Sequence, residues 1–143
     1  YGEAVLAVGI LDEDGDGGNC PSGDSSVTFG YENVASGNYA TVTGGYYNNA
    51  TGWASSVTGG RFNVASGSSS SVSGGSWNRA SGDYSSVSGG DGNEASGESS
   101  SVSGGSDNIA SASASAITGG FENKADGNYT AITGGTSNIA IGF

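Results

Sequence analysis

The sequence predicts an all-β protein, a parallel β-solenoid (β-roll) of about eight 15-residue coils with two short strands in each coil. Three observations support this fold: a strict 15-residue period, alternation of polar and apolar residues within the period, and glycines at the joints between the alternating segments. The repeating unit is V-[ST]-G-G-x-x-N-x-A-[ST]-G followed by four further residues, most of them serine-rich. Self-similarity at a fixed period is the signature of an array that stacks like residues on one another.

Three positions of the unit hold nearly the same residue in every copy. Val27 begins the valine or isoleucine series, Asn33 begins the asparagine series, and the alanine series extends from Ala35 to Ala140. We expect the first two series to form the structural core, with members Val42, Val57, Val72, Val87, Val102, Ile117, Ile132, Asn48, Asn63, Asn78, Asn93, Asn108 and Asn123.

Two short strands account for these positions. Ser-Val-Ser or Thr-Val-Thr alternates polar, apolar and polar residues, as a strand with one buried face does. The Asn-x-Ala-Ser step predicts the second strand, and glycines at both joints permit tight corners. Collagen is excluded because Gly30, Gly37 and Gly45 are seven and eight residues apart. Helical repeats are excluded because glycine pairs and β-branched residues recur in every unit.

We divide the chain into an N-terminal segment, residues 1–24, and a solenoid domain, residues 25–143. The stretch Ala4–Leu11 is the most apolar of the chain and predicts an end strand or cap that shields the first coil. The alternative is a strand that docks onto another subunit. Phe29 stands where later coils have glycine and is expected to plug the wider end of the core. Cys20, one period before Ala35, is expected to be a small buried thiol.

Composition excludes several classes of function. The chain of 143 residues has 14 acids and three bases, for a net charge of −11, which disfavours nucleic acid and anionic membranes as partners. No apolar run reaches the ~20 residues of a membrane span, so no membrane insertion is expected. The chain has no histidine and shows no pairing of a nucleophile with a base, so we expect no enzymatic activity.

An acidic loop in the N-terminal segment is the one candidate metal site. Asp12, Asp14 and Asp16 followed by Gly17 spell D-x-D-x-D-G, the opening of a calcium-binding loop. A calcium loop of this type closes with a bidentate glutamate, and the position where that glutamate belongs holds Gly23. The alternatives are therefore a calcium site and a solvated acidic loop, and calcium is the one cofactor that the sequence suggests.

Three surface rows are candidates for binding. Aromatic residues occupy the two corner positions after the glycine pair, where stacking would form a ladder that either stabilises the corner or contacts a sister chain, a protein or a glycan. The outward position after each asparagine has apolar members that suggest a covered face. The aromatic set is Tyr31, Tyr46, Tyr47, Phe62 and Trp77, and the apolar set is Val34, Val64, Ile109 and Ile139.

The third row consists of Thr/Ser-x-Thr/Ser pairs, from Thr41 and Thr43 through Ser101 and Ser103. Such pairs on a flat solenoid face resemble the ice-binding surface of insect antifreeze solenoids. Serine predominates in the middle coils, and Ala116 and Ala131 interrupt the later ones. The alternative role of these residues is to keep a thin rod soluble.

The repeat also resembles a family of adhesins. Three segments are similar to the head repeats of YadA-like trimeric autotransporter adhesins, whose unit is close to S-V-A-I-G-x-x-S-x-A-x-G-x-x. They are Ser26–Gly30, the closing Ala140-Ile141-Gly142, and Ser71-Val72-Ser73-Gly74-Gly75 followed by Asn78, Ala80 and Gly82. The resemblance implies a left-handed β-roll, three chains side by side, and adhesion at a bacterial surface. The period differs, 15 residues instead of 14, and glycine replaces the usual isoleucine.

We therefore expect an extracellular or cell-surface solenoid with a structural or adhesive role, which presents a repetitive surface and self-associates. Its thin core of valine and alanine predicts a homo-oligomer, either a trimer or an end-to-end polymer. A host surface protein or a glycan is a further partner of this kind of surface. Ice binding through the Thr/Ser rows and glycan binding through the aromatic stripe are the alternatives.

Overall fold

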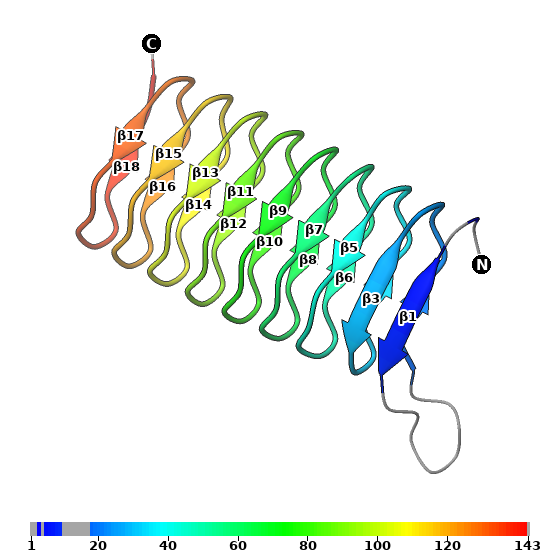
Figure 1. Cartoon of the computed structure of the whole chain (residues 1–143). Helices are drawn as coiled ribbons and strands as arrows, with labels where there is room; N and C mark the ends of the chain where they lie inside the picture. The colour runs from blue at the N-terminus through cyan, green and yellow to red at the C-terminus, as the bar shows by residue number, and fades with distance from the viewer. Residues whose placement is uncertain (1–2, 4, 10–17, 143) are drawn as a thin grey trace.

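The chain folds as a parallel β-solenoid of two sheets, seen from the side in Figure 1. The structure is a computed structural model and describes residues 3, 5–9 and 18–142. Within these residues each sheet has nine strands that pair in parallel, and no helix is present. The chain alternates between the sheets, so one turn supplies one strand to each. The predicted fold of two short strands per coil is confirmed.

Most strands are two residues long because a corner follows each one. The first sheet comprises β1 (Leu6–Gly9), β3 (Val27–Gly30), β5 (Thr41–Val42), β7 (Ser56–Val57), β9 (Ser71–Val72), β11 (Ser86–Val87), β13 (Ser101–Val102), β15 (Ala116–Ile117) and β17 (Ala131–Ile132). The second sheet comprises β2 (Cys20–Pro21), β4 (Val34–Ala35), β6 (Asn49–Ala50), β8 (Val64–Ala65), β10 (Arg79–Ala80), β12 (Glu94–Ala95), β14 (Ile109–Ala110), β16 (Lys124–Ala125) and β18 (Ile139–Ala140).

The core lies between the two sheets and is as narrow as the sequence predicts. Each strand of the first sheet from β5 on buries a valine or isoleucine, and strands of the second sheet bury the facing alanine. The ladder register pairs Val57 with both Val42 and Val72, so like residues stack along the axis. The predicted core from Val42 to Ile132 is confirmed.

A ladder of asparagines lines one corner of the coils and is buried from Asn33 to Asn123. The Asn78 side chain uses all of its usual hydrogen-bonding groups: Nδ2 donates to the carbonyls of Gly74 (2.9 Å) and Gly90 (3.0 Å), and Oδ1 accepts the backbone N–H of Asn93 (3.0 Å). The same pattern recurs from Asn48 to Asn123, and these side chains are buried. Because buried backbone groups must find partners, the ladder closes a corner that the short strands leave open.

Backbone conformation explains why the second glycine of each pair recurs from coil to coil. Gly60 has φ +83°, and a Cβ there would lie 2.1 Å from the carbonyl oxygen of Gly75. Gly59 beside it has nothing within 4 Å of the equivalent position. The second glycine is thus required by both its left-handed conformation and its contact with the next coil.

The coil register differs from the prediction at the N-terminal end. β3 pairs with β5 so that Thr28, and not Val27, aligns with Val42, which is a step of 14 residues. Thr28 is buried in the valine position while Val27 is half-buried. The prediction that Phe29 plugs the core is also wrong: strand alternation turns it away from the buried Thr28, and it lies outside the core cluster.

The same one-residue shift corrects the assignment of Cys20. Pro21, and not Cys20, pairs with Ala35 and is buried, so the cysteine points outward and its thiol is exposed. Asn19 lies 14 residues before Asn33 and extends the asparagine ladder, since its Oδ1 accepts the backbone N–H of Asn33 at 3.1 Å. Strands β1 and β2, which come from the segment 1–24, extend the two sheets (Figure 1). β2 pairs with β4 at the 14-residue step, whereas β1 pairs with β3 at a step of 21 residues, Leu6 with Val27.

Candidate functional site

The described residues present surfaces and no cavity. They enclose no pocket, and they contain no group of three or more His, Cys, Asp or Glu residues that could hold a metal ion. Asp12, Asp14 and Asp16 lie outside the described residues, so the calcium loop stays a prediction. The candidate sites are therefore the outer faces of the two sheets, called the first face and the second face, and the two edges where the chain turns.

The first edge, the corner that leads from the first sheet to the second, carries the predicted aromatic cluster. A row of single parallel bridges aligns its first position from coil to coil and passes through Tyr31, Tyr46 and Arg61. The position that follows holds Tyr47, Phe62 and Trp77, whose backbones are left-handed with φ between 54° and 58°.

Ring contacts connect all five members of this cluster. The Tyr47 and Phe62 rings stack with centroids 5.3 Å apart, and the Phe62 and Trp77 rings stack at 4.4 Å. Tyr46 contacts Tyr47 and Phe62 edge to face at 5.9 and 5.6 Å, and Tyr31 contacts Tyr47 at 6.2 Å. The predicted ladder is confirmed as a contact geometry, and aromatic pairs of this kind contribute about 0.5–1.5 kcal/mol each beyond the area they bury.

The cluster ends abruptly on the side of the C-terminal coils. Gly92 takes the position after Trp77 in the series and has no side chain to cover the outer face of the indole. Trp77 is 61% exposed. Three later positions of this edge are acidic, Asp91, Asp107 and Glu122. The first edge is thus aromatic over its first four coils and polar or acidic over the next two, and the exposed Phe121 follows in the coil after these.

One cation borders the cluster. The Arg61 guanidinium donates a hydrogen bond to the Tyr46 hydroxyl, which is the largest cause that raises the pKa of Arg61 above its usual value. An arginine side chain is charged at any physiological pH. The edge combines π surface with a fixed positive charge.

The second edge carries aromatic residues that the sequence analysis missed. Tyr39 and Trp53 contact each other edge to face with ring centroids 5.8 Å apart, and both are exposed. Tyr84 and Tyr129 are also exposed and occupy the position of Tyr39 in later coils. Their spacing of 45 residues, three periods, was the available signal.

The first face carries small side chains without charge. From β5 to β17 its outward positions form two straight rows of threonine, serine and alanine, for example Thr43 and Thr58 in the outer row. The Thr43 hydroxyl donates to the carbonyl of Thr58 at 2.8 Å. The Thr/Ser rows predicted from the sequence therefore lie on one flat surface.

The second face is rougher and charged. Its central row follows each asparagine and reads Val34, Asn49, Val64, Arg79, Glu94, Ile109, Lys124 and Ile139. Every member is half-buried or exposed, so the prediction that this row points outward is confirmed.

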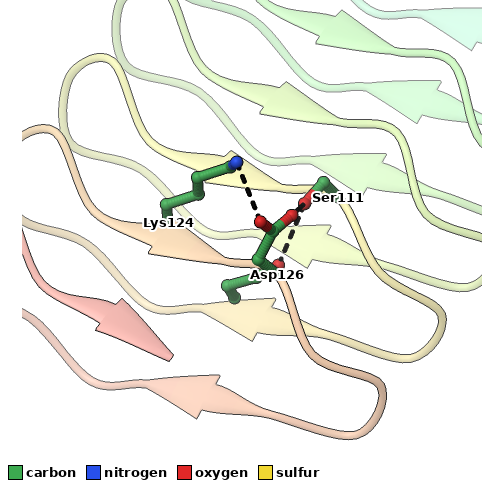
Figure 2. Close-up of polar contacts among 4 residues, drawn as sticks. Ser111, Lys124 and Asp126 are labelled. Atoms are coloured by element: carbon green, nitrogen blue, oxygen red, sulfur yellow. Dashed lines mark hydrogen bonds and ion pairs between the residues drawn. The ribbon is translucent and has the colours of Figure 1, made fainter. Parts of the chain in front are cut away.

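One ion pair lies on this face. Asp126 accepts hydrogen bonds from the Ser111 hydroxyl of the preceding coil and from Lys124 Nζ at 2.9 Å (Figure 2). Both hydrogen bonds lower the pKa of Asp126; the one from Ser111 has the larger effect and the one from Lys124 the next. Both ionic side chains are more than 40% exposed, so the pair contributes little to stability.

Comparison with known proteins finds no match, neither to a protein-family model nor to a curated protein. The described residues also contain no helix of the length and hydropathy that a membrane span requires.

Proposed function

We propose that this chain is a non-catalytic structural or adhesive solenoid of the extracellular space or cell surface, which presents a repetitive surface and self-associates. The observation that carries the proposal is the continuous contact of five aromatic rings along the first edge, most of them exposed. A contiguous exposed apolar surface with polar surroundings is typical of interaction sites. Stacked rings also give a rigid surface that loses little entropy on binding.

The resemblance to YadA-like head repeats supports the same role. We propose that the chain is related to those adhesin heads, with a unit longer by one residue in most coils. The step from Asn19 to Asn33 is 14 residues, which is the unit length of that family. A host surface protein or a glycan is the proposed partner of the first edge, because both present groups that stack on aromatic rings.

Binding assays with two tryptophan variants test the adhesive proposal. Trp77→Ala removes the exposed end of the first-edge cluster, while Trp53→Ala removes a tryptophan of similar exposure, 56%, from the second edge. On glycan arrays and on immobilised host surface proteins we expect Trp77→Ala to weaken binding by about tenfold or more, and Trp53→Ala to leave it unchanged. Equal binding by the wild-type chain and both variants would contradict a role for the first edge.

A second function, ice binding, is favoured by the first face. Two registered rows of uncharged, mostly hydroxyl side chains, with threonine methyl groups at both ends of the outer row (Thr43, Thr58, Thr118 and Thr133), resemble the lattice that orders water on antifreeze solenoids. The test is thermal hysteresis of the freezing point. We expect Thr58→Arg, on the first face, to abolish hysteresis and Thr51→Arg, on the second face, to leave it intact. A wild-type chain without hysteresis would remove this function.

A further inference from the structure

The central row of the second face is complementary to a second copy of the same row that runs in the opposite direction. Consecutive members of the row are Cα partners in the ladder, for example Val64 with Arg79 and Arg79 with Glu94. The row is therefore straight and spaced by the strand separation of about 4.8 Å. From Val34 to Ile139 the row has eight members, and the midpoint of these eight falls between Arg79 and Glu94, with β4, β6, β8 and β10 before it and β12, β14, β16 and β18 after it. β2, with the exposed Cys20 beside Val34, precedes β4 and has no counterpart after β18.

A second copy that is turned about this midpoint packs its second face antiparallel to the first. β10 then faces β12 of the copy, which places Arg79 opposite Glu94 in two symmetric pairs. β8 faces β14, which places Val64 against Ile109. The outer strands bring Val34 opposite Ile139 and Asn49 opposite Lys124. Opposite charges meet at the centre, and apolar residues meet on both sides of it.

The row beside it agrees with this arrangement. This flanking row consists of the residues two positions after each member of the central row, and its middle members are Ser66, Ser81, Ser96 and Ser111. Under the same rotation Ser81 faces Ser96, and Ser66 faces Ser111. Asp126, the one charge of this flanking row, faces Thr51. No pair of like charges is created in either row.

Parallel packing has the opposite result. Two copies that run in the same direction with their second faces together, or three copies whose second faces point to a common axis, bring Arg79 to Arg79, Glu94 to Glu94 and Lys124 to Lys124 when they lie at the same height. Like charges directly opposite one another are destabilising. Within the part of the chain that the structure describes, Arg79 and Glu94 form no ion pair, so both are available to a second chain.

We infer that the second face is a self-association surface and that two copies pack there antiparallel about a two-fold axis between Arg79 and Glu94. A closed two-fold interface uses the same patch on both subunits, which is the self-complementarity that this row has. The inference rests on the self-association that we propose for the chain and specifies its face and orientation. It leaves the aromatic first edge free on both copies.

Charge reversal tests the pairing by sedimentation analysis of the whole chain. Arg79→Glu and Glu94→Arg each replace two opposite-charge pairs by two like-charge pairs, so we expect each variant to weaken the dimer by about tenfold or more. The double variant and an equimolar mixture of the two single variants restore opposite charges across the interface, and both should dimerise like the wild type. Glu98→Arg, at an exposed corner, is the charge-matched control for Glu94→Arg and should not weaken the dimer.

The outcomes separate this inference from the proposed function. Three results would overturn the antiparallel pairing and leave self-association standing. They are self-association that neither single reversal weakens, a loss that the double variant fails to restore, and formation of a trimer. A wild-type chain that is monomeric at all concentrations would overturn both. Because all substituted side chains lie outside the core, circular dichroism of each variant should match the wild type.

Discussion

The asparagine ladder offers the sharpest test of how the coils hold together. In the fully buried Asn78, replacement by aspartate keeps the oxygen that accepts the Asn93 N–H at 3.0 Å. The second carboxylate oxygen, however, replaces the Nδ2 donor and faces the carbonyls of Gly74 and Gly90 at about the former distances, 2.9 and 3.0 Å. An ionised carboxylate there has two repulsive contacts and no water. We expect Asn78→Asp to lose about 3–5 kcal/mol of unfolding free energy at pH 7.

The pH dependence of this loss is the distinguishing measurement. Burial and the two carbonyls raise the pKa of the introduced carboxyl in the folded state above its unfolded value of about 3.9. Below that unfolded pKa the neutral acid can donate to one carbonyl, so the loss is about 1–2 kcal/mol. It grows as the pH rises through the folded pKa.

Urea unfolding of the Asn78→Asp variant and the wild type at pH 3 and pH 7 measures both losses. Asn128→Asp is the matched control, since this exposed amide also accepts a backbone N–H from the preceding coil, that of Ser113 at 3.2 Å. It should change stability little at either pH. A loss for Asn78→Asp that is the same at both pH values, or absent, would refute the reasoning about the ladder.

Three further predictions concern single positions. Gly60→Ala should cost at least about 3 kcal/mol because of its positive φ and the close carbonyl of the next coil, while Gly59→Ala should be neutral within about 0.5 kcal/mol in the same denaturant assay. Ser85→Ala should raise the unfolding free energy by about 1 kcal/mol, because the buried hydroxyl has no partner. Ser111→Ala should raise the pKa of Asp126 in an NMR titration, since the Ser111 hydroxyl is the main cause that lowers this pKa. In the wild type, the ionised Asp126 contributes a small stability above its unfolded pKa, and this contribution is lost as the pH falls through the folded pKa.

The interior of the solenoid could be predicted because each inward position meets the same surroundings in every coil. Val57 sits between two valines and Asn63 between two asparagines, so selection for packing and hydrogen bonding repeats with the period. The stacking of Phe62 on Trp77 followed from the same register. Once the period was known, the rows on both faces followed as well.

The first coil could not be placed by the period alone. Val27 keeps the 15-residue spacing to Val42, but the hydrogen bond of Asn19 with Asn33 sets a 14-residue step, which moves Thr28 into the core. A single missing residue in the corner near Phe29 separates the two registers. The spacing of 14 between Gly23 and Gly37, which contact each other closely, was a signal for this shift in the sequence.

The division between inside and outside also indicates where specificity resides. Inward positions are occupied by valine, alanine and asparagine with little variation, so they determine the rod and can distinguish no partner. Outward positions of the same coils vary: the position after each asparagine changes from Val64 through Arg79 and Glu94 to Ile109. A repeat that needed solubility alone would be satisfied by small uncharged residues at all of them, as on the first face. The non-repeating order on the second face and the aromatic half of the first edge are therefore the parts of the surface that a partner can recognise, and substitutions there should change binding without changing the fold.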